Sequence, residues 1–190
     1  MALTPSFTKP ASSVKGDQLL AELSKTSPEM TDEETCLALI EQGANVNVMD
    51  WRNGDRPLHI AVRRGHLRIA EALIAFGAMI DPVDGNDKTP LWMAADARDY
   101  DMIKLLLAHE ANPNKRDNDD GLTPLGAAAQ WGDAEAVRLL LDGGATPRAM
   151  SNPTLEILLP RLRPAIIRMF DEAEASIAAR RQGGQRPKGP

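Results

Sequence analysis

Apolar residues recur at helical spacing in three segments of the middle of the chain, and all three have the same order of apolar and polar positions. The segments are residues 69–74, 102–107 and 136–141. Each places several apolar side chains on one face, as Ile103 and Leu106 do in the second segment. Each segment therefore predicts an amphipathic helix, and their regular spacing predicts a structural unit that is repeated along the chain.

A shorter helix is predicted before each amphipathic one, at a Thr or Arg followed by Pro and Leu. The three copies are Arg56-Pro57-Leu58-His59-Ile60-Ala61, Thr89-Pro90-Leu91-Trp92-Met93-Ala94 and Thr123-Pro124-Leu125-Gly126-Ala127-Ala128, with prolines 33 and then 34 residues apart. Proline fits the first turn of a helix, because an N–H there would have no partner within the helix. We expect these first helices to end near Gly65, Arg98 and Gly132.

The ends of the second helices also repeat. Gly77 and Gly144 follow two of them, and glycine adopts the left-handed cap conformation without steric cost. The third repeat has Glu110 at this position and Arg98 where the other first helices have glycine. Both residues are therefore expected to be strained, by an amount of order 1 kcal/mol. A polar turn follows each second helix, at residues 50–54, 84–87 and 117–121.

Self-similarity at this period is typical of solenoid proteins, and the copies resemble the Thr-Pro-Leu-His-x-Ala signature of ankyrin repeats. The chain resembles the ankyrin-repeat family over roughly residues 17–150. The resemblance implies an all-α solenoid of helix-turn-helix repeats, with β-hairpin-like finger loops at the polar turns and capping repeats at both ends. It also implies that the ring of His59 bonds backbone groups and ties neighbouring repeats together.

The two ends depart from the repeat pattern. Thr31-x-x-Glu34 predicts a capping box that opens a helix, and Pro164 opens an apolar stripe that includes Ile166 and Phe170. A segment resembling a first helix precedes that stripe, at residues 153–159. The expected organisation is a disordered segment at 1–15, an ankyrin-repeat domain at 16–181 and a flexible tail at 182–190. Within the domain we expect a cap at 16–50, repeats at 51–83, 84–116 and 117–150, and a C-terminal cap at 151–181.

Composition narrows the class of protein. The formal net charge of the chain is −5, and the net charge of the residues before Arg161 alone is more negative than that. An acidic body of this kind argues against a nucleic-acid groove. A single cysteine, Cys36, cannot form an internal disulfide and favours a reducing compartment. No apolar run is long enough for a membrane helix, and the start lacks a secretory signal. We expect a cytoplasmic protein that is monomeric when free, with export as an effector left open.

No catalytic, cofactor or metal site is predicted. His66 is expected at the start of a second helix, and His109 is expected at a helix end that is open to solvent. Cys36 lies on an apolar helix face, which favours a small core residue. The acidic turn that starts at Asp117 lacks the glycine and glutamate that a calcium-binding EF-hand loop requires, because Leu122 and Ala128 stand at those positions. The sequence therefore favours a protein without enzymatic activity.

What remains is a surface for a protein partner. The resemblance implies a concave face built from the finger tips and the exposed side of the first helices, and two tryptophans are assigned to it. The residues expected on this face are Trp51, Arg52, Asp55, Arg63, Arg64, Asn86, Lys88, Asp96, Ala97, Asp119, Asp120, Leu122, Gln130 and Trp131. Large exposed aromatic side chains are over-represented among binding hot spots, which favours partner binding through this face.

Three functional hypotheses follow. The first is a protein–protein interaction module that acts as an adaptor, or as an inhibitor such as an immunity protein that covers a toxin. The second is an exported, host-directed effector that uses the same face. The third is an enzyme or small-ligand receptor that uses the groove, and it is disfavoured because no acid/base pair with plausible burial is visible.

Overall fold

The computed structural model describes residues 11–25, 32–119, 121–149 and 164–183. The chain divides into two compact units, residues 1–85 (unit 1) and residues 86–190 (unit 2), which are described separately. Throughout the described ranges every regular element is a helix and no residue is in a β-strand. This agrees with the all-α repeat fold expected from the sequence.

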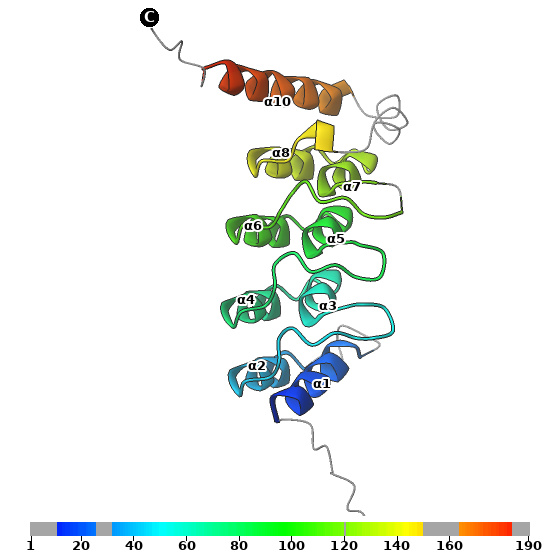
Figure 1. The fold of residues 1–190 in the computed structure, drawn as a ribbon, viewed down its shortest axis with the longest axis vertical. Coiled ribbons are helices and arrows are strands. Elements are labelled where there is room, and N and C mark those ends of the chain that lie inside the picture. The colour runs from blue at the N-terminus through cyan, green and yellow to red at the C-terminus, as the bar shows by residue number, and fades with distance from the viewer. Residues whose placement is uncertain (1–10, 26–31, 120, 150–163, 184–190) are drawn as a thin grey trace, which may run out of the picture. The chain divides into compact units, whose positions relative to one another are not determined.

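Unit 1 consists of two layers of paired helices (Figure 1). Its helices are α1 (Ala11–Leu23), α2 (Glu33–Glu41), α3 (Pro57–Arg63) and α4 (Leu67–Ala75). Helix α1 packs against α2 and α3, and α4 packs against α2 and α3. The interior is filled by side chains with no exposed surface, among them Leu19, Ile40, Ile69 and Leu73. This packing removes the apolar faces predicted for these helices from water.

Helix α1 begins earlier than the sequence suggested. It starts at Ala11, so the segment 1–15 that was expected to be disordered overlaps a helix, while residues 1–10 lie outside the described residues. The helix passes close to the chain after α2, because a Cβ built on Gly16 would lie 3.1 Å from the backbone oxygen of Asn45. Glycine is unfavourable inside a helix, but at this position its missing side chain allows the close packing. The pattern of apolar residues does not reveal this contact.

Helix α2 has a different N-cap from the one predicted. The helix begins at Glu33 with Asp32 at the N-cap position, and Thr31 of the expected capping box lies outside the described residues. The Asp32 carboxylate accepts a hydrogen bond from the Thr35 hydroxyl, and the Asp32 backbone N–H donates to Glu22 of α1 at 2.9 Å. The hydrogen bond from Thr35 lowers the pKa of Asp32. The start of α2 is thereby connected to α1.

Unit 2 contains two complete helix pairs and a longer C-terminal helix. Its elements are α5 (Pro90–Ala97), α6 (Tyr100–Ala108), α7 (Pro124–Gln130), α8 (Ala134–Asp142), a 3-10 turn η2 (Pro147–Ala149) and α10 (Pro164–Gly183). Within and between the pairs, α5 packs on α6 and α7, and α8 packs on α7 and α6. Leu106 and Leu140, which hold equivalent positions in the second helices, are completely buried.

The helix starts and ends follow the predicted pattern. Pro57, Pro90 and Pro124 each occupy the first turn of a first helix. The two strained positions are also confirmed, because Arg98 has φ 57° and Glu110 has φ 62°, both in the left-handed region. A third residue of this kind, Asp87 with φ 56°, was not predicted. It lies in a polar turn, where the sequence offers no comparable glycine pattern.

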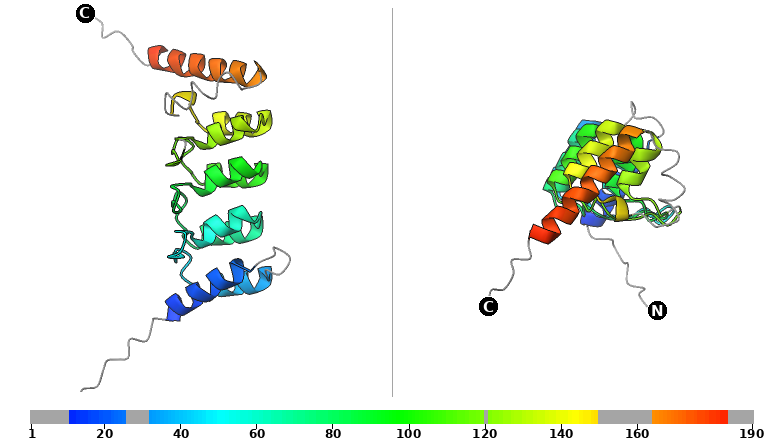
Figure 2. Two further views of the ribbon diagram at one scale, coloured as in Figure 1. Left: turned by 90° about the vertical axis from the view of Figure 1, so that its right-hand side faces the viewer. Right: turned by 90° about the horizontal axis from the view of Figure 1, so that it is seen from above.

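Helix α10 covers the last repeat, as Figure 2 shows, and it contacts α8 and η2. The side chains of Ile166 and Phe170 are buried. Arg148 and Glu174 form an ion pair of 2.7 Å that connects η2 to this helix. The stripe that starts at Pro164 thus packs as a cap, while the expected helix at 153–159 lies outside the described residues. Because α10 extends to Gly183, it overlaps the start of the expected tail at 182–190.

The fingers are closed by backbone hydrogen bonds but are not regular strands. In unit 1 the Asp50 N–H donates to the Asp55 oxygen at 2.7 Å, and in unit 2 the Asp117 N–H donates to the Leu122 oxygen at 2.9 Å. Within each unit an asparagine side chain connects one repeat to the next. The Asn47 amide donates to the Gly77 oxygen at 2.9 Å and accepts from the Met79 N–H at 2.8 Å, and Asn114 bonds Gly144 and Thr146 in the same way.

Candidate protein-binding surface

The first finger of unit 1 holds the most exposed aromatic side chain among the described residues. Trp51 follows Asp50 at the turn of this finger, and its side chain is 83% exposed. The Arg52 backbone N–H donates to the Asp50 carboxylate at 3.0 Å, and the Arg52 guanidinium lies 5.8 Å from the centre of the Trp51 ring. The backbone under Trp51 is thus fixed by the Asp50 turn while the ring remains open to solvent.

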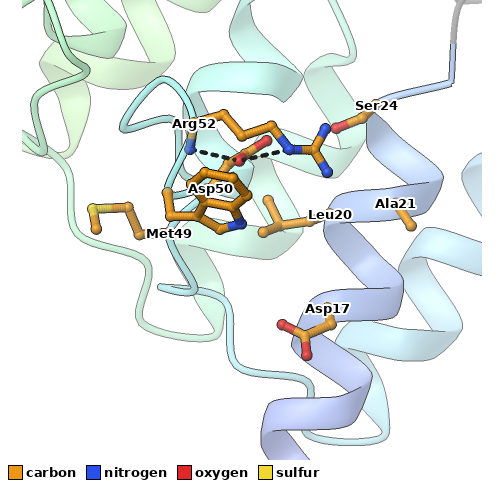
Figure 3. Close-up of a pocket in the computed structure, with 8 residues that line it drawn as sticks. Asp17, Leu20, Ala21, Ser24, Met49, Asp50 and Arg52 are labelled. Carbon is orange, nitrogen blue, oxygen red and sulfur yellow. Dashed lines mark hydrogen bonds and ion pairs between the residues drawn. The ribbon is translucent and has the colours of Figure 1, made fainter.

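A cleft lies beside this finger, on its α1 side (Figure 3). Its volume is about 420 Å³. It is lined by three residues of α1, by Ser24 directly after that helix and by four residues at the finger, namely Asp17, Leu20, Ala21, Ser24, Met49, Asp50, Trp51 and Arg52. The walls include both apolar and charged side chains, and Arg52 forms an ion pair with Asp50 at 3.8 Å. A cleft of this size and composition can accept a side chain of a partner protein.

Asp55 does not lie on the exposed face where it was expected. Its side chain is only 2% exposed, and its carboxylate accepts from both terminal nitrogens of the Arg63 guanidinium at 2.6 and 2.7 Å. The hydrogen bond to Asp55 raises the pKa of Arg63. The prediction that Asp55 is exposed on this face was therefore wrong, because its carboxylate is buried where it binds Arg63. Arg63 itself is exposed and Arg64 is half-buried.

In unit 2 the structure brings two candidates together at the fingers. The Lys88 ammonium lies 3.3 Å from the Asp119 carboxylate and 4.4 Å from the centre of the Trp92 ring. Asn86 is exposed, and its backbone oxygen accepts from the Asn118 N–H at 3.3 Å. Adjacent fingers of this unit are thus joined by a backbone hydrogen bond and an ion pair.

Leu122 is a second correction. Its side chain is 2% exposed, and its backbone N–H donates to the Asp117 carboxylate at 2.9 Å. An apolar residue that closes a finger against the first helix is buried by that closure, so it is not available to a partner. Asp120 lies outside the described residues. Asp119 is therefore the described acidic side chain at the tip of this finger, and it is exposed.

Trp131 lies at the other end of the first helix. It is the C-cap residue of α7, whereas the finger leads into the N-terminus of α7, so the helix length of about 10 Å separates the two. The Trp131 indole N–H donates to the Asp96 carboxylate at 2.7 Å, and the ring is 57% exposed. Gln130 and Ala97 are exposed nearby along these helix ends. In unit 2 the candidates therefore form two groups, at opposite ends of the first helices.

His59 has the structural role that the resemblance implied. Its Nδ1 accepts from the Arg56 backbone N–H at 3.1 Å, and its Nε2 lies 3.3 Å from the Pro82 carbonyl oxygen. The first bond assigns the proton to Nε2, which then donates to Pro82. Burial lowers the pKa of this histidine. A neutral ring thus joins the start of α3 to the next turn by bonding backbone groups on both sides.

Cys36 is buried, and burial raises the pKa of its thiol to about 12, so a thiolate does not form at neutral pH. Among the residues that the structure describes, no three or more His, Cys, Asp or Glu side chains gather as a metal site. In the same part of the chain no helix has both the length and the apolar character to cross a membrane.

Sequence reasoning missed several residues of these surfaces. Met49 is exposed and lines the cleft beside Trp51, and Tyr100 is exposed at the start of α6. Arg98 was predicted to be strained but not to contact an aromatic ring, and its guanidinium lies 5.8 Å from the centre of the Trp131 ring. The sequence did single out Arg98 as unusual, because it stands where the other repeats have glycine.

Comparison with known proteins places the chain in a family. A family model described as "Ankyrin repeats (3 copies)" matches residues 27–117 and 81–151. The chain is similar to the human ARF GTPase-activating protein GIT1, with 35% identity over 74 residues, which is 39% of this chain and 10% of that protein. It is similar to human Rabankyrin-5, with 31% identity over 105 residues, 49% of this chain and 9% of the relative.

A third relative is Inversin of Gallus gallus, 34% identical over 93 residues, which is 49% of this chain and 8% of Inversin. The chain thus covers about a tenth of the length of these relatives. Ankyrin repeats are generally protein–protein interaction modules. Because the family model matches more than half of the chain, and the helix pairs and fingers have the expected form, the chain belongs to the ankyrin-repeat family.

Proposed function

We propose that the chain is a non-catalytic protein-binding module that uses its fingers and first helices as an adaptor or inhibitor. The observation that carries this proposal is Trp51, an indole ring that is 83% exposed on a finger whose backbone is fixed by hydrogen bonds. A large apolar side chain that stabilises no core is costly to keep in water, and tryptophan is enriched among the residues that dominate binding.

The surroundings of Trp51 support a protein partner. The cleft beside it offers apolar contact from Leu20 and Met49, and charged groups of both signs from Asp50 and Arg52. Interfaces combine an apolar centre with a polar rim in this way, whereas a polyanion would require a basic surface. The ordered finger also reduces the entropy that is lost when a partner binds.

Capture of the partner by the full chain tests this proposal. The chain is used as bait in a cell extract, the bound proteins are identified by mass spectrometry, and the affinity of the purified partner is then measured. We expect Trp51→Ala to weaken binding by more than about 2 kcal/mol, the threshold for a hot spot. The melting temperature of the chain should change little, because the ring covers no core residue.

Phe76→Ala is the matched control, since Phe76 is another exposed aromatic residue, at the C-cap of α4 rather than on a finger. It should leave affinity unchanged. Equal losses from Trp51→Ala and Phe76→Ala would show that the finger is not the contact, and an unchanged affinity in Trp51→Ala would refute the proposal. Adding Trp131→Ala to Trp51→Ala then asks whether the other end of the first helices contributes to the same partner.

A further inference from the structure

A compact cluster occupies the C-terminal ends of α5 and α7 in unit 2. We call it the Arg98–Trp131 patch, and it consists of Asp96, Arg98, Tyr100, Trp131 and Asp133. Trp131 is held by its hydrogen bond to Asp96 at 2.7 Å, and the Tyr100 hydroxyl donates to the Asp133 carboxylate at 3.0 Å. Both bonds cross from one repeat to the next. Two aromatic side chains that are partly open to solvent are thus fixed in orientation.

The two carboxylates of the patch already have donors within the protein. Asp96 accepts from the indole N–H of Trp131. Asp133 accepts from Tyr100 on one oxygen and, on the other, from the backbone N–H groups of Glu135 and Ala136 at 3.1 Å each, as the N-cap of α8. These hydrogen bonds hold both carboxylates in place beside the two aromatic side chains.

Arg98 carries the positive charge of the patch, and unlike the two carboxylates its side chain is not held by a hydrogen bond within the patch. The Arg98 guanidinium lies 5.8 Å from the centre of the Trp131 ring, and among the described residues it forms no ion pair. Its backbone has φ 57°, a conformation that is held by glycine at the equivalent positions 65 and 132. The backbone at this position is therefore more strained with arginine than it would be with glycine. The side chain offers a bidentate donor for a carboxylate beside an exposed aromatic face.

We propose that the Arg98–Trp131 patch binds a protein segment in which a carboxylate side chain stands next to an apolar one. The carboxylate pairs with Arg98, and the apolar side chain packs on Trp131 and Tyr100. A cationic segment is disfavoured, because Arg98 already lies over the indole ring and repels a second cation. Within unit 2 the patch is separated from the finger that leads into α7 by the length of that helix, so it is a surface apart from that finger. The proposal does not depend on binding through Trp51.

The test uses the full chain labelled with ¹⁵N and two blocked pentapeptides, Gly-Leu-Glu-Leu-Gly and its twin with Gln in place of Glu. The indole N–H signal of Trp131, assigned with Trp131→Phe, reports binding. We expect the Glu peptide to shift this signal and to bind about three- to fivefold more tightly than the Gln peptide, the range of a partly exposed ion pair. The difference should shrink as the salt concentration rises.

Arg98→Gly separates binding from stability. It should abolish the preference for the Glu peptide while raising the melting temperature, because glycine relieves the left-handed strain. Glu110→Gly is the matched control, since it relieves the same strain at φ 62° outside the patch. It should raise the melting temperature and keep the preference.

Equal binding of the two peptides, a preference that survives in Arg98→Gly, or no shift of the Trp131 signal at millimolar peptide would each overturn the proposal. A shift confined to the Trp51 signal would also overturn it, while leaving the finger surface as the binding site. Loss of partner affinity in Trp51→Ala is a separate readout, so failure of one proposal does not decide the other.

Discussion

The Asp55 carboxylate receives one hydrogen bond on each oxygen from the Arg63 guanidinium, at 2.6 and 2.7 Å. Asp55 is in the first finger and Arg63 is the last residue of α3, so the pair connects the finger to the end of the first helix of the same repeat. A further bond comes from the Asn53 side-chain amide at 2.6 Å. A buried carboxylate with three such donors holds the finger in place, and its loss should be measurable.

Asp55→Ala should lower the free energy of unfolding by about 2–3 kcal/mol, since three hydrogen bonds to a buried charged group are lost. Urea denaturation followed by circular dichroism measures this change. Arg52→Ala is the control, because Arg52 and Asp50 form a more exposed pair at 3.8 Å and should contribute less than about 1 kcal/mol. Equal effects of the two variants would contradict the role assigned to Asp55.

The buried His59 predicts a dependence of stability on pH. Burial lowers its pKa below the ordinary value of 6.5, so the unfolded chain binds a proton at a pH where the folded chain does not. Stability from this group is therefore complete above about pH 6.5 and falls as the pH drops below that value, by up to ~1.4 kcal/mol per pH unit. Urea midpoints at pH 7.5, 6.5 and 5.5 test this sign.

His59→Asn removes the titrating ring and should flatten the dependence between pH 7.5 and 5.5, although the variant will be less stable at every pH. His109→Gln is the comparison, because His109 is exposed at the C-cap of α6 and its removal should leave the slope as in the wild type. A wild-type stability that rises as the pH falls through this window would refute the buried neutral histidine.

Glu110→Gly and Gly144→Ala form a reciprocal pair at equivalent helix ends. Glu110 has φ 62° and Gly144 has φ 92°, and a Cβ on Gly144 would have no atom within 4 Å. Backbone conformation alone should then determine the effect. We expect Glu110→Gly to stabilise the chain and Gly144→Ala to destabilise it, each by about 1 kcal/mol. Thermal melts decide, and changes of the same sign in both variants would be incompatible with this reasoning.

Leu106→Ala should cost about 2–5 kcal/mol, because the side chain is completely buried on α6 and its removal leaves a cavity. Lys104→Ala on the same helix is the control, since Lys104 is exposed and its ion pair with Asp101 on the same helix, at 3.1 Å, is exposed as well. Chemical denaturation gives both values. A midpoint for Leu106→Ala within error of the wild type would exclude it from the core.

Truncation after Ser151 should expose the apolar surface that α10 covers and give an aggregating or partly unfolded product. Phe170→Ala tests the same packing in the full chain, because Phe170 is buried in the cap, and it should cost about 3–5 kcal/mol. Light scattering and a thermal melt report the two effects. If the truncated chain stayed monomeric and unfolded cooperatively, α10 would have a role other than capping.

The repeat pattern was sufficient to predict the helix pairs, their proline starts and the strain at Arg98 and Glu110. These features depend on local properties of the chain, namely helical periodicity, the missing N–H of proline and the conformational freedom of glycine. The start of α1 was not predicted, because residues 11–15 show little apolar periodicity. The close approach of Gly16 to Asn45 was also missed, since it is a contact between residues far apart in sequence.

The candidate surface was predicted less well, for a related reason. Repeat position indicates which residues lie near the fingers, but the exposure of each side chain depends on its partners. Asp55 is buried because Arg63 binds it, and Leu122 is buried because the finger closes over it. Trp131 is exposed at the end of α7, as its position before Gly132 indicates, but the repeat pattern does not show that Asp96 accepts a hydrogen bond from its indole N–H.

The side-chain bonds of Asn47 and Asn114 have a consequence for how this protein can change in length. Each asparagine reaches a carbonyl 30 residues later and an N–H 32 residues later, in unit 1 and in unit 2 alike. Insertion of one residue inside a repeat shifts both partners away from the amide, whereas insertion of a whole repeat places an identical pair in reach. We therefore expect insertions and deletions to be tolerated when they comprise a complete repeat. The interaction surface can then grow or shrink in steps of one finger and one helix pair.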